Sequence, residues 1–222
     1  MFDTQAQFPR PIMNEYTLLI LFALLAIAFS FLCSLWESVL LSISPSYAHI
    51  EEEKGTSVGR QLQNFKANID VPLSAILTLN TIAHTVGAIG VGNQASQIWA
   101  ESNPLVTGLV VPALMTLAIL ILSEIIPKTL GANYWKEFTS FTVYSLAVLV
   151  KVLAPLVWAT QLITRSLRKD GEGAVFTRHE FLAMTDMGAK EGVFDPWESE
   201  VIRNLLRFNT VKARDVMTPR TV

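Results

Sequence analysis

The sequence is poor in cysteine and in charge. Its 222 residues include one cysteine, Cys33, so no intrachain disulfide can form. The position of Cys33 inside an apolar run indicates a small buried side chain. Charged residues make up 16% of the chain, against roughly 25% in soluble domains. The net charge of −2 gives no sign of a nucleic-acid-binding surface. The sequence also shows neither a nucleophile–base pair nor a phosphate loop, so we do not expect an enzyme.

Long apolar runs dominate what is present. The first run, residues 16–43, is long enough to cross a bilayer of about 30 Å with some tilt. No cleavage-site pattern follows it, so we interpret it as a retained span and not as a signal peptide. Two further runs cover residues 71–99 and 104–127. These runs predict an all-α membrane protein with three transmembrane helices.

The basic residues predict the orientation of these spans. The segment after the first span contains Lys54, Arg60 and Lys66, and the segment after the third span contains Lys128 and Lys136. The loop between the second and third spans has no lysine or arginine. By the positive-inside rule, the tail of residues 1–14 lies outside and the C-terminus lies in the cytoplasm of a multi-pass protein of the inner or plasma membrane.

A fourth apolar stretch, residues 141–162, is interrupted by Lys151 and Pro155. If it crossed the membrane, the basic run "RSLRK" at residues 165–169 would lie outside, against the same rule. We therefore predict a juxtamembrane or re-entrant helix over about 136–168, with four full spans as the alternative. The predicted transmembrane domain is residues 15–169.

The chain becomes polar after residue 169. The patterns "TRHE" and "DPWE" are typical of capping boxes that open helices. We predict a small cytosolic helical segment over residues 170–210. The last stretch, residues 211–222, resembles the beginning of another domain that the chain does not complete.

Polar residues occur at span depth in all three predicted spans. A membrane-embedded carboxylate costs about 2.5–3.5 kcal/mol on insertion scales and commonly marks an ion pathway. Residues four apart on a helix share a face, which applies to Ser34 with Ser38 and to Asn80 with His84. The candidates are Ser34, Glu37 and Ser38 in the first span, Asn80, His84 and Gly87 in the second, and Ser123, Glu124, Pro127 and Lys128 in the third.

Oxygen atoms predominate among these groups, which favours a hard cation such as Mg²⁺, Ca²⁺ or Na⁺. Pro127 cannot donate to the carbonyl of Ser123, and such freed carbonyls are tolerated where they line a cavity. Other interpretations stay open. Serines in membrane helices often bond to the i−4 carbonyl, His84 can be a packing residue, and Lys128 can pair with Glu124.

The residues also resemble a known family. The stretches "CSLWESVLLSISPSYAHI", "ILTLNTIAHTVGA" and "LSEIIPKTLGA" resemble the three signatures of the CorC/CNNM magnesium transporter membrane domain. The tail "VFDPWESEVIRNLLRFNTVKARDVMTPRTV" resembles the helical linker and the opening of the CBS-pair domain that follow it. Trp36 and Val39 depart from the usual small residues, but neither replaces a candidate oxygen ligand.

The resemblance implies a homodimer in a lipid membrane, with a cytosolic CBS pair that binds ATP. It implies Mg²⁺ export, driven by Na⁺ entry. It also implies an ion site formed by Ser34, Ser38, Asn80, Ser123 and Glu124 with backbone oxygens. Further candidates for coordination or for the coupled cation are Glu37, His84, Gly87, Pro127 and Lys128. The alternative is a non-transporting membrane sensor or scaffold that signals through its CBS domain.

Overall fold

The computed structural model describes residues 15–99, 103–167, 178–208, 212 and 217, and every regular element within them is helical. The predicted outer tail, residues 1–14, and nearly all of residues 211–222 lie outside the described residues. The chain divides into two compact units, residues 1–167 and 168–222.

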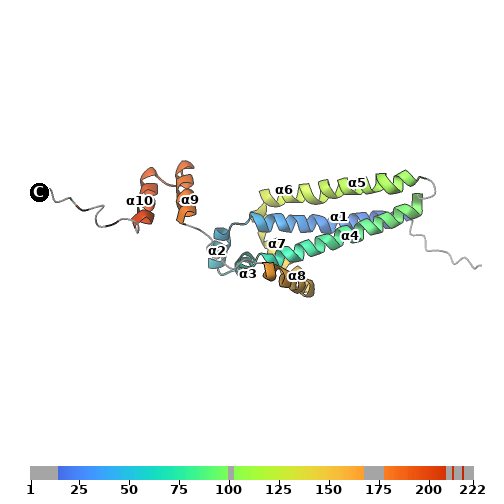
Figure 1. The fold of residues 1–222 in the computed structure, drawn as a ribbon, viewed down its shortest axis with the longest axis horizontal. Helices are drawn as coiled ribbons and strands as arrows, with labels where there is room; N and C mark the ends of the chain where they lie inside the picture. The colour runs from blue at the N-terminus through green and yellow to red at the C-terminus, as the bar shows by residue number, and fades with distance from the viewer. Residues whose placement is uncertain (1–14, 100–102, 168–177, 209–211, 213–216, 218–222) are drawn as a thin grey trace, which may run out of the picture. The chain divides into compact units, whose positions relative to one another are not determined.

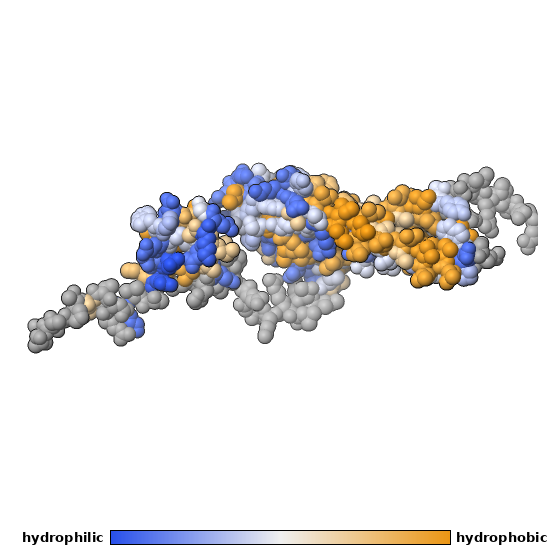
Figure 2. Space-filling view, turned by 90° about the horizontal axis from the view of Figure 1, so that it is seen from above, coloured by the Kyte–Doolittle hydropathy of each residue, from blue (hydrophilic) through white to orange (hydrophobic). Residues whose placement is uncertain are grey.

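Three helices of the first unit are long and apolar enough to cross a membrane: Tyr16–Ser42, Asp70–Trp99 and Val106–Asn133. They run side by side in Figure 1, and apolar residues gather over them in Figure 2. The prediction of an all-α membrane fold with three spans is confirmed. The elements that form them are α1 (Glu15–Ser42), α4 (Asp70–Trp99), η1 (Val106–Val110), α5 (Val111–Ala118), η2 (Ile119–Ile125) and α6 (Ile126–Asn133).

Helix α1 is the central element, because it packs against α4, η2, α6 and α7 (Trp135–Val152). Its buried side chains join those of the neighbouring helices in one apolar cluster. Cys33 and Leu40 of α1 lie in this cluster with Leu62 and Leu146, and all four are fully buried. The first span therefore supplies both the membrane crossing and the core.

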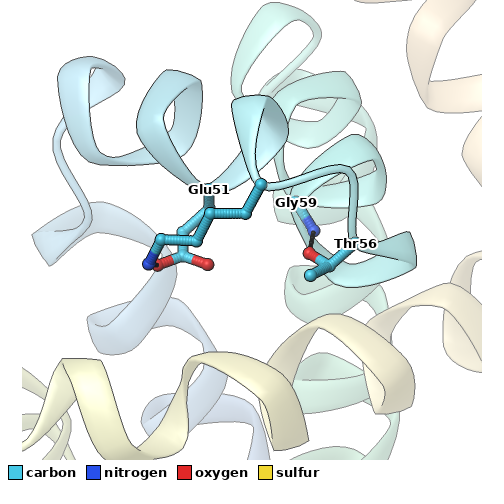
Figure 3. Close-up of polar contacts among 4 residues, drawn as sticks. Glu51, Thr56 and Gly59 are labelled. Atoms are coloured by element: carbon cyan, nitrogen blue, oxygen red, sulfur yellow. Dashed lines mark hydrogen bonds and ion pairs between the residues drawn. The ribbon is translucent and has the colours of Figure 1, made fainter.

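Two short helices, α2 (Pro45–Glu53) and α3 (Ser57–Ala67), follow α1 and form a tight pair. Thr56 caps α3 by accepting a hydrogen bond of 3.0 Å from the Gly59 N–H, as Figure 3 shows. A Cβ atom on Gly59 would lie 2.0 Å from the carbonyl oxygen of Glu51, so only glycine permits this approach. Lys54 donates to Glu51 at 2.6 Å, and this hydrogen bond lowers the pKa of the Glu51 carboxyl.

The predicted juxtamembrane helix is two helices, α7 and α8 (Ala154–Leu167). They are bent by 81° between Val152 and Ala154, near the interruption that Lys151 and Pro155 indicated in the sequence. The reason is local: Pro155 has no N–H to continue the hydrogen-bond ladder, and its ring disfavours a helical residue before it. Helix α7 packs against α1 and α3, whereas α8 packs against α4.

The third span continues beyond its predicted end at residue 127 to Asn133. Pro127 was expected to break it, but the chain stays helical through a π-helical stretch, η2, directly before the proline. The Ile126 N–H donates to the Ile121 carbonyl, five residues back. The wider π turn lets the helix pass the position where proline offers no donor.

The second unit contains a pair of packed helices, α9 (Arg178–Lys190) and α10 (Pro196–Arg207). Asp195 precedes α10, and its N–H donates to Glu198 Oε2 at 2.9 Å, as the "DPWE" pattern predicts. An ion pair between Arg203 and Asp186 joins the two helices. The predicted helical character of this segment is therefore observed.

Candidate cation site

The C-terminal half of α1 presents three candidate residues to its neighbours. Ser34 is buried, and Glu37 and Ser38 are half-buried. The Ser38 hydroxyl donates a hydrogen bond of 2.6 Å to the carbonyl oxygen of Lys128 on α6. Because the hydroxyl hydrogen is already donated, the Ser38 oxygen can only accept from, or coordinate, a further ligand.

A glycine makes this contact possible. A Cβ atom on Gly131 would lie 2.8 Å from the Ser38 Cβ and 3.0 Å from the Leu35 carbonyl oxygen. Helices α1 and α6 therefore approach closely just beyond the π-helical stretch. Gly131 was not among the predicted site residues. Its spacing of four residues after Pro127, on the same helix face, was a usable signal.

Ser123 is fully buried in η2, and its hydroxyl donates to the Ile119 carbonyl at 2.7 Å. This is the i−4 back-bond that the sequence left open. As with Ser38, the bond uses the hydroxyl hydrogen and leaves an oxygen that can only accept. The carbonyl of Ser123 lacks its ordinary α-helical donor because residue 127 is proline.

Asn80 of α4 carries the most informative atom of the site. Its Oδ1 is buried, and the described residues offer it no hydrogen-bond partner. An unsatisfied buried acceptor costs about 1–3 kcal/mol. Such an atom is explained if it binds a ligand with positive charge or a donor, since native proteins rarely leave one alone.

Glu124 is half-buried in η2, and it has no hydrogen bond or ion pair among the described residues. The alternative that Lys128 pairs with Glu124 is not observed. Lys128 Nζ instead lies 3.3 Å from Glu37 Oε2 on α1. The carboxylate of Glu124 is thus available to a cation, whereas that of Glu37 is already engaged.

The remaining candidates on α4 serve helix packing. His84 Nε2 lies 2.7 Å from the hydroxyl oxygen of Ser30 on α1. Gly87 permits close contact, because a Cβ atom there would lie 2.3 Å from the Ala26 Cβ. Ser30 was not predicted, although it precedes Ser34 by four residues and so continues the row of serines on α1.

The elements that carry the predicted ligands pack against α1, which contacts α4, η2 and α6. Within the part of the chain that the structure describes, no group of three or more His, Cys, Asp and Glu side chains could hold a metal. A cation between these helices would therefore depend on one carboxylate together with hydroxyl, amide and backbone oxygens. That donor set fits a hard cation and does not fit zinc or copper.

Three apolar helices around a buried polar seam define an α-helical, multi-pass membrane protein. The chain belongs to the CNNM family, since the family model "Cyclin M transmembrane N-terminal domain" matches residues 20–198. The predicted membership in the CorC/CNNM family is confirmed.

Several relatives support this assignment. A UPF0053 protein of Synechocystis is 28% identical over 86% of this chain and 54% of its own length. A UPF0053 protein of Haemophilus influenzae is 25% identical over 83% of this chain and 44% of its own length. A chloroplastic DUF21 domain-containing protein of Arabidopsis thaliana is 27% identical over 76% of this chain. The chain spans about half the length of the first two relatives.

Proposed function

We propose that this chain is the membrane part of a homodimeric, Na⁺-coupled transporter that exports Mg²⁺. The cargo ion would bind between the spans of each subunit. The observation that carries this proposal is the buried, unpartnered Oδ1 of Asn80, which lies on a helix packed against the serine-bearing face of α1. The resemblance of the three span motifs to magnesium transporters supports Mg²⁺ as the cation.

The oxygen atoms of the site can replace the water molecules that Mg²⁺ must lose on binding. This ion wants six oxygens at 2.0–2.1 Å and gives up its water reluctantly. Glu124 would supply the negative charge, and Ser34, Ser38, Asn80 and Ser123 would supply neutral oxygens. The hydroxyls of Ser38 and Ser123 already donate to backbone carbonyls, so they are oriented as acceptors before the ion arrives.

The wider context of the proposal follows the resemblance. The N-terminus would lie outside, the C-terminus in the cytoplasm, and the protein in the inner or plasma membrane. A CBS pair beyond the described residues would bind ATP and regulate transport. No catalytic reaction is proposed for the chain.

The test uses the full-length protein in liposomes that contain a Mg²⁺-sensitive dye. We expect a Mg²⁺ flux that depends on an opposing Na⁺ gradient and that Glu124→Gln abolishes. Thr129→Ala is the matched control, because Thr129 is exposed on α6 and donates only to the Ile125 carbonyl. A Glu124→Gln protein with wild-type flux would disprove the site.

A separate measurement distinguishes transport from sensing. If the protein binds Mg²⁺ but carries no flux under any Na⁺ gradient, the chain is a sensor or scaffold and the transport proposal is wrong. Binding is followed as Mg²⁺-dependent thermal stabilisation of the purified protein.

A further inference from the structure

The three spans contain three charged side chains away from their first residues: Glu37, Glu124 and Lys128. One lysine therefore faces two possible carboxylates. Pairing with Glu124, four residues back on the same helix, is the ordinary expectation for a lysine at this spacing. The structure shows the other arrangement, in which Lys128 Nζ lies 3.3 Å from Glu37 Oε2 across the helix interface.

The backbone contact explains this choice. Ser38, the residue after Glu37, donates its hydroxyl to the Lys128 carbonyl at 2.6 Å. The close approach at Gly131 holds α6 against the same turn of α1. Lys128 is thus fixed to α1 by its own main chain beside Glu37, and its ammonium reaches that carboxylate.

The choice has a consequence for Glu124. A lysine ammonium on Glu124 would neutralise the one carboxylate that the cation site can use, and a divalent cation would have to displace it. With Lys128 held by Glu37, no lysine ammonium occupies the Glu124 carboxylate. Glu37, in turn, is unavailable as a ligand while the lysine occupies it.

We propose that Glu37 is a positioning residue that holds Lys128 away from Glu124 and so keeps the cation site negatively charged. This inference rests on the proposed function. It differs from the sequence-based expectation that Glu37 coordinates or carries a cation itself. The ion pair across α1 and α6 is what sets the affinity of the site.

The test is a double-mutant cycle on the full-length protein in detergent, with the Mg²⁺ concentration for half-maximal thermal stabilisation as the readout. We expect Glu37→Gln to raise this concentration about tenfold, within the range typical of coupled sites. Lys128→Gln alone should leave it within about twofold of wild type, because the competing charge is gone. The double variant Glu37→Gln/Lys128→Gln should recover the wild-type value.

The control is Lys136→Gln. It removes an exposed lysine that lies over the Trp135 ring and is not one of the candidate site residues. It should change nothing. The decisive result is recovery in the double variant together with a near-wild-type response of Lys128→Gln. A direct ligand role for Glu37 would prevent the recovery, and a purely structural ion pair would weaken Lys128→Gln as well.

Three results would overturn the inference. Glu37→Gln could leave the Mg²⁺ response unchanged. The double variant could stay as weak as Glu37→Gln, which would make Glu37 a ligand. Lys128→Gln could be as weak as Glu37→Gln, which would make the pair structural. If Glu37→Gln does not fold alone, the double variant against the wild type decides, because a ligand role for Glu37 would leave the double variant weak. If instead the wild type shows no Mg²⁺ response, the proposed function itself fails.

Discussion

The two halves of the three-span body are built differently. We name the half that contains Ser42 and Asn133 the inner half and the opposite half the outer half, after the orientation that the basic residues predict. In the inner half of α1, Cys33, Val39 and Leu40 are completely buried among α3, α4, α6 and α7. In its outer half, Leu24 is 61% exposed and Ile20 is 54% exposed. Polar contacts follow the same division: the Glu37–Lys128 pair and the Ser38–Lys128 bond lie in the inner half.

The difference shows where a cation can be held. Charged and unpartnered polar groups are tolerated only where protein or a water-filled cavity, not lipid, surrounds them. The inner half provides such a setting, because α6 and α7 pack against α1 and Leu62 of α3 lies in the same buried cluster. The outer half contributes mainly an apolar surface to the bilayer, and the His84–Ser30 contact lies near the middle of the spans.

The strongest way to break the inner half is to separate α1 from α6. Gly131→Val should destabilise the protein by about 3 kcal/mol, because the new side chain would overlap Ser38 and the Leu35 backbone. Denaturant unfolding in micelles measures the loss. Gly92→Val is the matched control, since a Cβ atom there meets nothing within 4 Å. Equal losses in the two variants would contradict the close packing of α6 on α1.

The C-terminal end of α1 depends on a lysine from α3. Lys66 Nζ donates to the Leu40 carbonyl at 2.8 Å, and partial burial lowers the pKa of Lys66. Charged hydrogen bonds contribute about 1.5–3 kcal/mol, and the positive charge also favours a helix C-terminus. Lys66→Met should therefore lower the unfolding free energy by about 2 kcal/mol.

Lys54→Met provides the comparison for Lys66→Met. Lys54 is exposed, and its ion pair is with Glu51 on the same short helix pair. Its removal should leave the unfolding midpoint unchanged, because an exposed pair is screened by solvent. If both variants lose the same stability, the anchoring role of Lys66 is wrong.

Substitution of Asn80 should raise the unfolding free energy of the metal-free protein, whereas Gly131→Val and Lys66→Met should lower it. Asn80→Leu removes an unsatisfied buried acceptor at similar volume, so the metal-free protein should gain about 1 kcal/mol. The same variant should lose its Mg²⁺-dependent stabilisation. Thermal unfolding with EDTA and with MgCl₂ measures both effects, and a metal-free loss of stability would show that the amide has a structural partner.

The smallest effect is expected near the middle of the spans. Ser30→Ala removes the contact with His84 at 2.7 Å, and hydrogen bonds between membrane helices average about 0.6 kcal/mol. The unfolding free energy should fall by about that amount, with the Mg²⁺ response unchanged. A large loss of the Mg²⁺ response would place Ser30 in the cation site and blur the division between the two halves.

Much of the fold could be predicted from local sequence. The spans beginning near residues 16 and 71 are observed almost where they were predicted, because hydropathy is a sum over neighbouring residues. The capping pattern at Asp195 is observed for the same reason, since a cap involves only four consecutive residues. Pro155 indicated an interruption, but neither its 81° angle nor its position after Val152 could be derived from the sequence.

The residues of the candidate site could be predicted from the sequence, but the contacts that they make with other helices could not. Asn80, Ser123 and Glu124 stood out because polar groups are rare at span depth. That Pro127 would follow a π turn and not an unwound break depended on the packing of η2 and α6 against α1. Ser30 and Gly131 gained a role only when their neighbours on other helices were known.

Runs of consecutive residues specify the membrane-spanning helices, the family motifs and the oxygen atoms at span depth. The tertiary structure decided how the charges are distributed. Lys128 is four residues from Glu124 in the chain, yet it pairs with Glu37, ninety-one residues away. The choice belongs to the interface of α1 and α6, where a hydroxyl and a glycine bring the two backbones together.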